Sequence, residues 1–254
     1  MPDTEAARFV GVGLGPGDPE LVTVKAVRVL SRADVILVPQ TERAGADLGR
    51  AERLVRDLRP DAAGVLERVD FAMRQSPAGA VEPADSRTRQ SARDQAAARV
   101  AARFDTGARL IAMATIGDPS VFSTFSYLAE AVRRDRPAVR VEVVPGITAM
   151  QALAAAAGVP LVIGDETLTL VPATAGTAAL ERALALPDCS VVAYKGGRQL
   201  PMMRDLLARY GRLPGALLGT DIGGADQRLS ALADLDPDAK APYFTTLLSP
   251  AVSR

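Results

Sequence analysis

Short apolar runs rich in β-branched residues recur along this chain and alternate with stretches long enough to form a helix. We expect strands at Phe9–Gly13, Val35–Val38, Leu110–Thr115, Val139–Val144, Leu168–Val171, Val191–Tyr194, Ala216–Gly219 and Phe244–Leu248. Most of these runs are continuously apolar, which is typical of strands that are covered on both faces. Strands that alternate with helices predict an α/β fold with largely parallel sheets.

A domain boundary is expected near the middle of the chain. The charged run Arg133–Arg136 ends an expected helix, and Pro137 cannot continue it. At roughly 150 residues per domain, the 254 residues allow one large domain or two modest ones. We therefore predict an N-terminal α/β domain over residues 1–137 and a C-terminal α/β domain over residues 138–254.

Three helices and one irregular segment complete this outline. Helices are expected to begin directly after Asp18 and after Asp118, and a largely apolar helix is expected over Thr148–Ala157. The segment Met73–Arg93 has no apolar periodicity, so it is interpreted as a loop, either a lid or a disordered insertion.

Composition excludes several kinds of chemistry. The chain has no histidine, which argues against Ser-His-Asp triads and histidine-ligated zinc, and no metal site is expected. Its 30 basic and 30 acidic residues give no net charge, which argues against bulk nucleic-acid binding and a polybasic membrane anchor. A single cysteine, no signal-peptide pattern and no long apolar run favour a cytoplasmic protein without a membrane span.

A glycine-rich turn follows the first expected strand. Its sequence is Gly13-Leu14-Gly15-Pro16-Gly17-Asp18-Pro19, which suits close approach of a ligand to the backbone beside a helix N-terminus. A phosphate-binding P-loop is excluded because no Gly-Lys-Ser/Thr follows. A dinucleotide site requires an acidic residue after the second strand, whereas Asp34 precedes that strand. A tight structural turn explains this motif alone equally well.

Three further turns follow expected strands. Gly117-Asp118-Pro119 has the same glycine, cap and proline order, and Asp118 either caps a helix or presents its carboxylate to a ligand amine or hydroxyl. Val144–Thr148 leads into a helix whose free N–H groups suit a carboxylate. Lys195 and Arg198 follow another strand and either meet anionic groups or are simply solvated. Each turn has an ordinary structural explanation when taken singly.

Together, the order and wording of these motifs closely resemble the tetrapyrrole methylase family. The resemblance is carried by Gly13–Pro19, Gly117–Pro119 and Val144–Thr148, and it extends from Phe9 to Leu248. The stretches Gly117–Phe125, Gly164–Leu168 and Pro242–Thr246 look most like those members that methylate C20 of precorrin-2 in cobalamin biosynthesis.

This resemblance implies two α/β domains with mostly parallel or mixed sheets, an active-site cleft between them and a homodimer. It implies S-adenosylmethionine as the methyl donor, held largely by backbone groups. The implied donor-binding residues are Pro16, Ile116, Gly117, Asp118, Val121, Thr148, Ala149, Lys195, Ile222 and Thr246. The family often has a methionine at the position of Lys195, so its amine is expected to face the substrate. No catalytic base is assigned, although Asp18 or Asp118 could assist proton loss.

The tetrapyrrole substrate that the resemblance implies is a polycarboxylate, which calls for arginine. The candidates for substrate binding are Arg43, Arg74 and Arg198, with Arg68, Arg87 and Arg89 as further ones. Within the family the alternatives are uroporphyrinogen-III methylation and a later precorrin methylation. Outside it, a nicotinamide-dependent oxidoreductase and a binding module without turnover are the competing hypotheses.

Overall fold

The computed structural model describes residues 6–40, 48–71, 73–75, 81–83, 86–242 and 244–252. The described chain divides into two compact units, of which the first ends at Thr148 and the second begins at Ala149. The boundary predicted after Pro137 does not coincide with this division. Strand β7 (Arg140–Val144) pairs with strand β1 (Arg8–Gly13), so it completes the first sheet instead of starting the second unit.

The first unit is built on a five-stranded parallel sheet. Its strand order is β3-β2-β6-β1-β7, in which β2 is Val35–Pro39, β3 is Leu66–Val69 and β6 is Leu110–Thr115. Every pairing in this sheet is parallel, so the carboxyl ends of all five strands share one edge. In open sheets of this kind, ligands bind outside the carboxyl ends of the strands.

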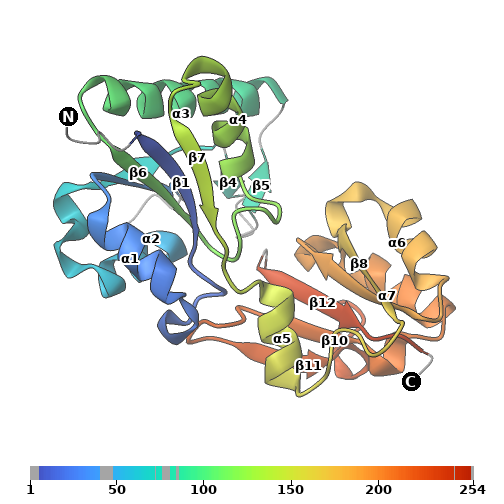
Figure 1. Cartoon of the computed structure of the whole chain (residues 1–254). Coiled ribbons are helices and arrows are strands. Elements are labelled where there is room, and N and C mark those ends of the chain that lie inside the picture. The colour runs from blue at the N-terminus through green and yellow to red at the C-terminus, as the bar shows by residue number, and fades with distance from the viewer. Residues whose placement is uncertain are drawn as a thin grey trace. The chain divides into compact units, whose positions relative to one another are not determined.

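Helices cover both faces of the first sheet (Figure 1). On one face, α1 (Val24–Arg32) and α2 (Arg50–Leu58) contribute Leu30 and Val55 to a buried core. On the other, α3 (Ser86–Asp105) and α4 (Phe125–Asp135) contribute to a second core. The ring of Phe125 packs directly on Gly11, where an added Cβ would lie 2.7 Å from a ring carbon. The absence of a side chain at Gly11 therefore allows α4 to approach β1 closely.

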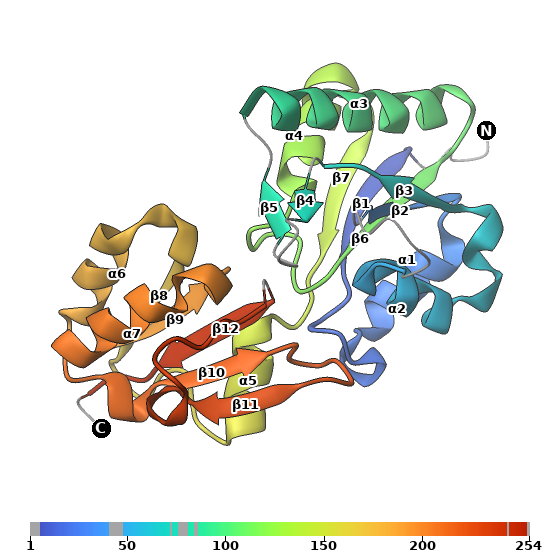
Figure 2. The same cartoon turned by 180° about the vertical axis from the view of Figure 1, so that it is seen from behind.

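The second unit is built on a mixed five-stranded sheet of order β11-β10-β12-β9-β8 (Figure 2). Its strands are β8 (Thr167–Pro172), β9 (Cys189–Tyr194), β10 (Leu217–Thr220), β11 (Arg228–Ala231) and β12 (Thr245–Ser249). Strands β8 and β9 are parallel, and the other pairings are antiparallel. The largely parallel arrangement expected from the sequence therefore applies to the first sheet and not to the second.

Helices α6 (Thr177–Leu184) and α7 (Leu200–Arg209) share a buried core with one face of the second sheet. Helix α5 (Ala149–Ala157) packs against β12 and β11. It buries Leu153 and leaves Ala155 and Ala156 exposed, so it is less buried than its apolar sequence suggests.

A small hairpin and several short helices complete the described elements. The hairpin pairs β4 (Met73–Gln75) with β5 (Val81–Pro83). The 3-10 helices are η1 (Pro19–Leu21), η2 (Pro60–Gly64), η3 (Ala173–Ala175), η4 (Gly197–Gln199), η5 (Leu213–Gly215) and η6 (Leu232–Asp234).

All eight predicted strands are present within one or two residues of their expected bounds, and the helix placements need three corrections. The helix expected directly after Asp18 is η1, and α1 begins later because Thr23 caps it by accepting a hydrogen bond from the Ala26 N–H. The helix expected after Asp118 begins only at Phe125. In the segment Met73–Arg93, which was expected to be a loop, β4 and β5 form a hairpin and the residues from Ser86 onward belong to α3.

Candidate active site

Three of the predicted turns lie together at the carboxyl edge of the first sheet. They follow β1, β6 and β7, which are neighbours in the strand order and run parallel. Gly13, Thr115 and Val144 end these strands. The register therefore brings the first turn together with two turns that lie more than a hundred residues later in the sequence.

Glycine backbones interlock the three turns. The Gly117 N–H donates to the Gly15 carbonyl at 2.7 Å, and the Gly15 N–H donates back at 3.3 Å. An added Cβ on Gly146 would lie 2.2 Å from the Gly117 carbonyl oxygen, and one on Gly13 would lie 2.6 Å from the Gly146 nitrogen. Only residues without side chains allow this approach, so the glycines that sequence analysis singled out for a ligand also pack against one another.

Asp118 joins the second and third turns through its carboxylate. One oxygen accepts hydrogen bonds from the N–H and the hydroxyl of Ser120, and the other accepts one from the Gly146 N–H at 2.9 Å. Burial acts to raise the pKa of Asp118, but these hydrogen bonds outweigh it and hold the pKa below its ordinary value of 3.8. Asp118 as a whole residue is 8% exposed. Asp118 is therefore an ionised brace between two loops, and it does not cap α4.

Two other carboxylates bear on the alternatives left open by the sequence. Asp18 accepts a hydrogen bond from the Glu20 N–H at 2.8 Å and caps η1. Asp34 accepts hydrogen bonds from the N–H groups of Arg109 and Leu110, where β6 begins. Asp34 therefore lies at the amino edge of the sheet, opposite the glycine turns, and cannot bind a ribose there. This placement argues against the nicotinamide hypothesis.

Backbone strain gathers in the loops that follow strands of both sheets. Among the described residues, the non-glycine residues with positive φ are Phe122, Lys195 and Asp221, at 50°, 61° and 52°. Phe122 lies in the loop after β6, Lys195 directly follows β9, and Asp221 directly follows β10. Left-handed backbone costs such residues roughly 1–2 kcal/mol, and such strain clusters at functional sites.

In the second unit, one row of residues crosses the sheet beside Lys195 and Asp221. Thr246 of β12 lies opposite Tyr194 on one side and Gly219 on the other. The Tyr194 hydroxyl accepts a hydrogen bond from the Met150 N–H at 2.8 Å, which fixes the start of α5. Ile222, which is buried, folds over Gly219, where an added Cβ would meet its side chain at 2.6 Å.

The predicted donor-binding residues therefore fall into two sets. Those in the first unit surround the interlocked turns: Pro16, Ile116, Gly117, Asp118, Val121 and Thr148. Those in the second unit lie at or beside the row through Thr246: Ala149, Lys195, Ile222 and Thr246. Within each unit, residues distant in sequence are neighbours. Their contact with a methyl donor stays a prediction.

Lys195 differs from its neighbours because it carries a charge into a partly buried position. Burial lowers the pKa of its amine, and the backbone has positive φ there. A partly desolvated ammonium group on a strained backbone position is suited to an anionic or polar ligand group.

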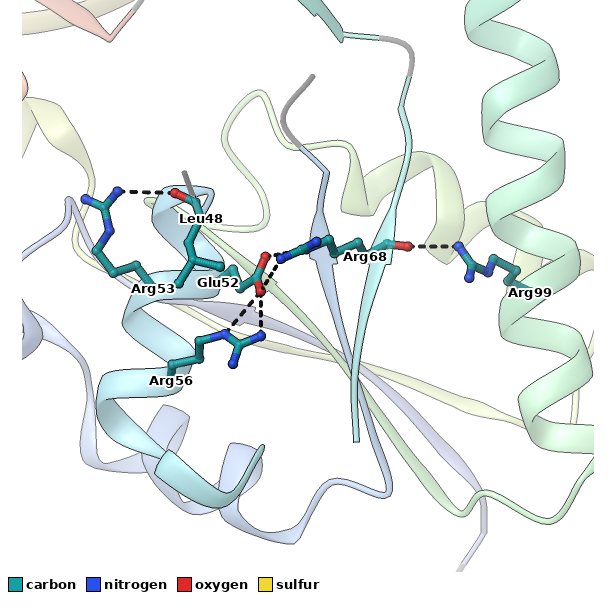
Figure 3. Close-up of polar contacts among 6 residues, drawn as sticks. All are labelled: Leu48, Glu52, Arg53, Arg56, Arg68 and Arg99. Atoms are coloured by element: carbon teal, nitrogen blue, oxygen red, sulfur yellow. Dashed lines mark hydrogen bonds and ion pairs between the residues drawn. The ribbon is translucent and has the colours of Figure 1, made fainter. Parts of the chain in front are cut away.

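The predicted substrate arginines have different outcomes. Arg43 lies outside the described residues, as do the side chains of Arg74 and Arg89. Arg198 is exposed on η4. Arg68 instead makes a bidentate ion pair with Glu52 of α2 (Figure 3). Arg87 is exposed at the start of α3.

Sequence reasoning missed two residues that organise these regions. Tyr194 was predicted to end a strand and to begin the turn with Lys195 and Arg198, but no contact was assigned to its hydroxyl. Glu52 was not singled out. It is 2% exposed, and hydrogen bonds from Arg68 and Arg56 outweigh burial and lower its pKa. Its charged helix sequence gives no sign that this residue is buried.

No helix within the described ranges is both long and apolar enough to span a membrane.

Comparison with known proteins places this geometry in a family. The family model described as Tetrapyrrole (Corrin/Porphyrin) Methylases matches residues 8–235. A precorrin-2 C(20)-methyltransferase from Sinorhizobium sp is 35% identical over 251 residues, which are 98% of this chain and 98% of that protein. A cobalt-precorrin-2 C(20)-methyltransferase from Salmonella typhimurium is 29% identical over 242 residues, 95% of each.

A solved structure shares the fold. Uroporphyrin-III C-methyl transferase from Thermus thermophilus, complexed with S-adenyl homocysteine, has a TM-score of 0.64 and 24% sequence identity. The match covers 97% of this chain and 99% of that one. The α/β architecture predicted from the alternation of strands and helices is therefore confirmed.

Proposed function

We infer the function from the family, because this chain belongs to the tetrapyrrole (corrin/porphyrin) methylases. We propose that it transfers the methyl group of S-adenosylmethionine to C20 of precorrin-2, giving precorrin-3A in cobalamin biosynthesis. The observation that carries this proposal is the likeness, over nearly the full length of both chains, to a precorrin-2 C(20)-methyltransferase.

The reaction requires little acid–base catalysis by the protein. The donor supplies an electrophilic methyl group on a sulfonium. The bond from sulfur to methyl breaks as the bond from methyl to C20 forms, S-adenosylhomocysteine leaves, and the macrocycle loses a proton. Holding two reactants in line can lower such a barrier by about 7–11 kcal/mol. A chain without histidine is compatible with a reaction that depends on positioning.

The turns of the first unit fit a donor held by backbone groups. Gly13 and Gly146 leave no side chain at their point of contact, and Asp118 uses both carboxylate oxygens to hold the loops. We propose that Asp118 orients these loops and that the donor is bound through their backbone. In the second unit, Lys195 and Thr246 are the proposed polar contacts.

The proposal is tested by incubating the protein with precorrin-2 and S-adenosylmethionine labelled with ¹³C at the methyl group. We expect NMR to place the label on C20, with S-adenosylhomocysteine as the second product. Label on another ring carbon would indicate a different member of the family. Tight binding of the tetrapyrrole without any mass gain would indicate a binding module.

Assays with two substrates distinguish a metal-free from a cobalt-bearing substrate. The two relatives described above carry names of both kinds. We propose the metal-free substrate, since the relative so named has the higher identity. Parallel assays with precorrin-2 and cobalt-precorrin-2 compare kcat/KM, and a higher value for the cobalt compound would reverse this assignment.

We propose further that the enzyme works in the cytoplasm as a homodimer, without nucleic-acid partners. The family resemblance supports the dimer, and the single cysteine, Cys189, supports a reducing compartment. Sedimentation velocity measures the dimer directly, and a single monomeric species at assay concentration would contradict it.

A further inference from the structure

A buried carboxylate of α2 holds two arginines beside the edge strand β3 of the first sheet (Figure 3). Glu52 lies in the first turn of α2, and its side chain is 3% exposed. The Arg68 guanidinium donates to it through Nε at 2.7 Å and Nη2 at 2.9 Å. The Arg56 guanidinium donates through Nε at 3.1 Å and Nη2 at 2.9 Å. One carboxylate thus fixes two guanidinium planes.

This cluster keeps a net positive charge and unused donors. Two guanidinium groups face one carboxylate, so one positive charge is uncompensated within the cluster. The side chains of Arg56 and Arg68 are 40% and 51% exposed. Within the described part of the chain, their Nη1 groups make no hydrogen bond. A guanidinium with free N–H groups in a fixed plane is suited to bind a carboxylate.

The cluster lies at the same edge of the sheet as the glycine turns. Arg68 is the next-to-last residue of β3, and Glu52 lies near the start of the helix that follows β2. Strand β3 is two places from β6 in the sheet, which corresponds to about 10 Å at the usual strand spacing. One large ligand with charged substituents could thus contact both the arginine cluster and the glycine turns.

We propose that Arg56 and Arg68, held by Glu52, bind a peripheral carboxylate of the tetrapyrrole substrate. This inference rests on the proposed function and adds a substrate contact that the sequence did not assign to Arg56. Glu52 is a positioning residue, because it acts on the substrate only through the two arginines. The methyl donor also carries a carboxylate, so the experiment must distinguish the two ligands.

A purely structural role for the cluster is the competing explanation, since Arg68 also fastens the edge strand β3 to α2. The chain offers a matched control for that role. On the other side of β3, Glu67 pairs with Arg103 of α3 at 2.6 Å, and Arg103 is 47% exposed. Replacing Arg103 breaks a similar ion pair on the same strand without touching the cluster.

The test compares the variants R56Q, R68Q, E52Q and R103Q in steady-state methyl transfer, with KM measured separately for precorrin-2 and for S-adenosylmethionine. Hydrogen bonds to charged groups are worth enough to change affinity about tenfold or more. We expect R56Q, R68Q and E52Q to raise KM for precorrin-2 by at least about tenfold, with kcat and KM for the donor unchanged. R103Q is expected to leave all three constants at the wild-type values.

Each other outcome overturns the inference. A rise in KM for the donor alone would mean that Arg56 and Arg68 bind the methyl donor and not the tetrapyrrole. Equal effects of R68Q and R103Q would mean that Arg68 only attaches β3 to the neighbouring helix. If the wild-type protein transfers no methyl group, the proposed function fails. The pair is then judged by fluorescence titration with uroporphyrin III, an octacarboxylate. Equal Kd values for wild type and R68Q would then overturn the inference. If R68Q is too unstable to measure, equal Kd values for wild type and R56Q would overturn it.

Discussion

The carboxylate of Asp118 accepts hydrogen bonds from two loops that follow neighbouring strands. Asp118→Asn replaces one acceptor oxygen by a donor, which opposes an N–H of Ser120 or Gly146. We expect a loss of about 1–3 kcal/mol in the free energy of unfolding near neutral pH. Urea unfolding monitored by circular dichroism measures this loss, and an unchanged midpoint would show that the brace contributes nothing.

The same residue predicts how stability changes with acid. The pKa of Asp118 is lowered in the folded protein from an ordinary value of 3.8. Its contribution to stability is therefore fully present above about pH 4 and is lost as the pH falls through the lowered pKa. The wild type should lose more stability than D118N between about pH 5 and pH 2. Parallel acid dependence of the two proteins would contradict this assignment.

Gly146 provides the steric counterpart at the same loops. Gly146→Ala would place a Cβ 2.2 Å from the Gly117 carbonyl oxygen, so the loops must separate. We expect a loss of about 1–3 kcal/mol in stability, together with weaker binding of S-adenosylhomocysteine in isothermal titration calorimetry. Gly215→Ala is the control, because no atom lies within 4 Å of the position that its Cβ would take. Equal behaviour of the two variants would mean that close packing of the turns is unimportant.

At the scale of elements, Gly11 sets how closely α4 approaches β1. Gly11→Ala brings a methyl group against the ring of Phe125, at 2.7 Å, and should destabilise the protein by about 1–3 kcal/mol. The double variant G11A/F125L removes the ring carbons that clash. We expect this double variant to be more stable than the sum of the two single-variant losses predicts. Additive changes in the midpoint of thermal unfolding would exclude this coupling.

The elements that sequence reasoning predicted are those with unambiguous apolar patterns. Buried strands such as β6 were found because every residue in them is apolar or small. Strand β3 was missed because Glu67 and Arg68 interrupt its short run, and α3 was missed because it carries no continuous apolar stripe. The helix starts were misplaced because the sequence offers competing caps, such as Asp18 and Thr23.

In the candidate site, too, only the features with a local sequence pattern were predicted. The glycine turns were predicted from their position after strands, which is a local pattern. The ion pair of Glu52 with Arg68 and the hydrogen bond of Met150 with Tyr194 join residues 16 and 44 positions apart. No local pattern encodes such pairs, because they depend on which strands become neighbours in each sheet.

At the scale of the whole molecule, ligand-linked stability distinguishes the methylase from the nicotinamide hypothesis. S-adenosylhomocysteine at a hundred times its Kd should stabilise the folded protein by about 2.7 kcal/mol. That corresponds to a rise in Tm of about 5–10 °C for a chain of this size. NAD and NADP at the same concentration should leave Tm unchanged. A rise with a nicotinamide nucleotide, and none with S-adenosylhomocysteine, would exclude the methylase assignment.

Strand β12 is the last of the described strands in chain order, yet it occupies the centre of the second sheet. Before residues 245–249 have been synthesised, the strands can form only two separate ribbons, β8 with β9 and β10 with β11. In these ribbons β9 and β10 each lack the partner strand that β12 later provides. During translation the second sheet can therefore be completed only after β12 has been synthesised. A chain interrupted just before β12 would expose the unpaired edges of β9 and β10, which are prone to aggregation.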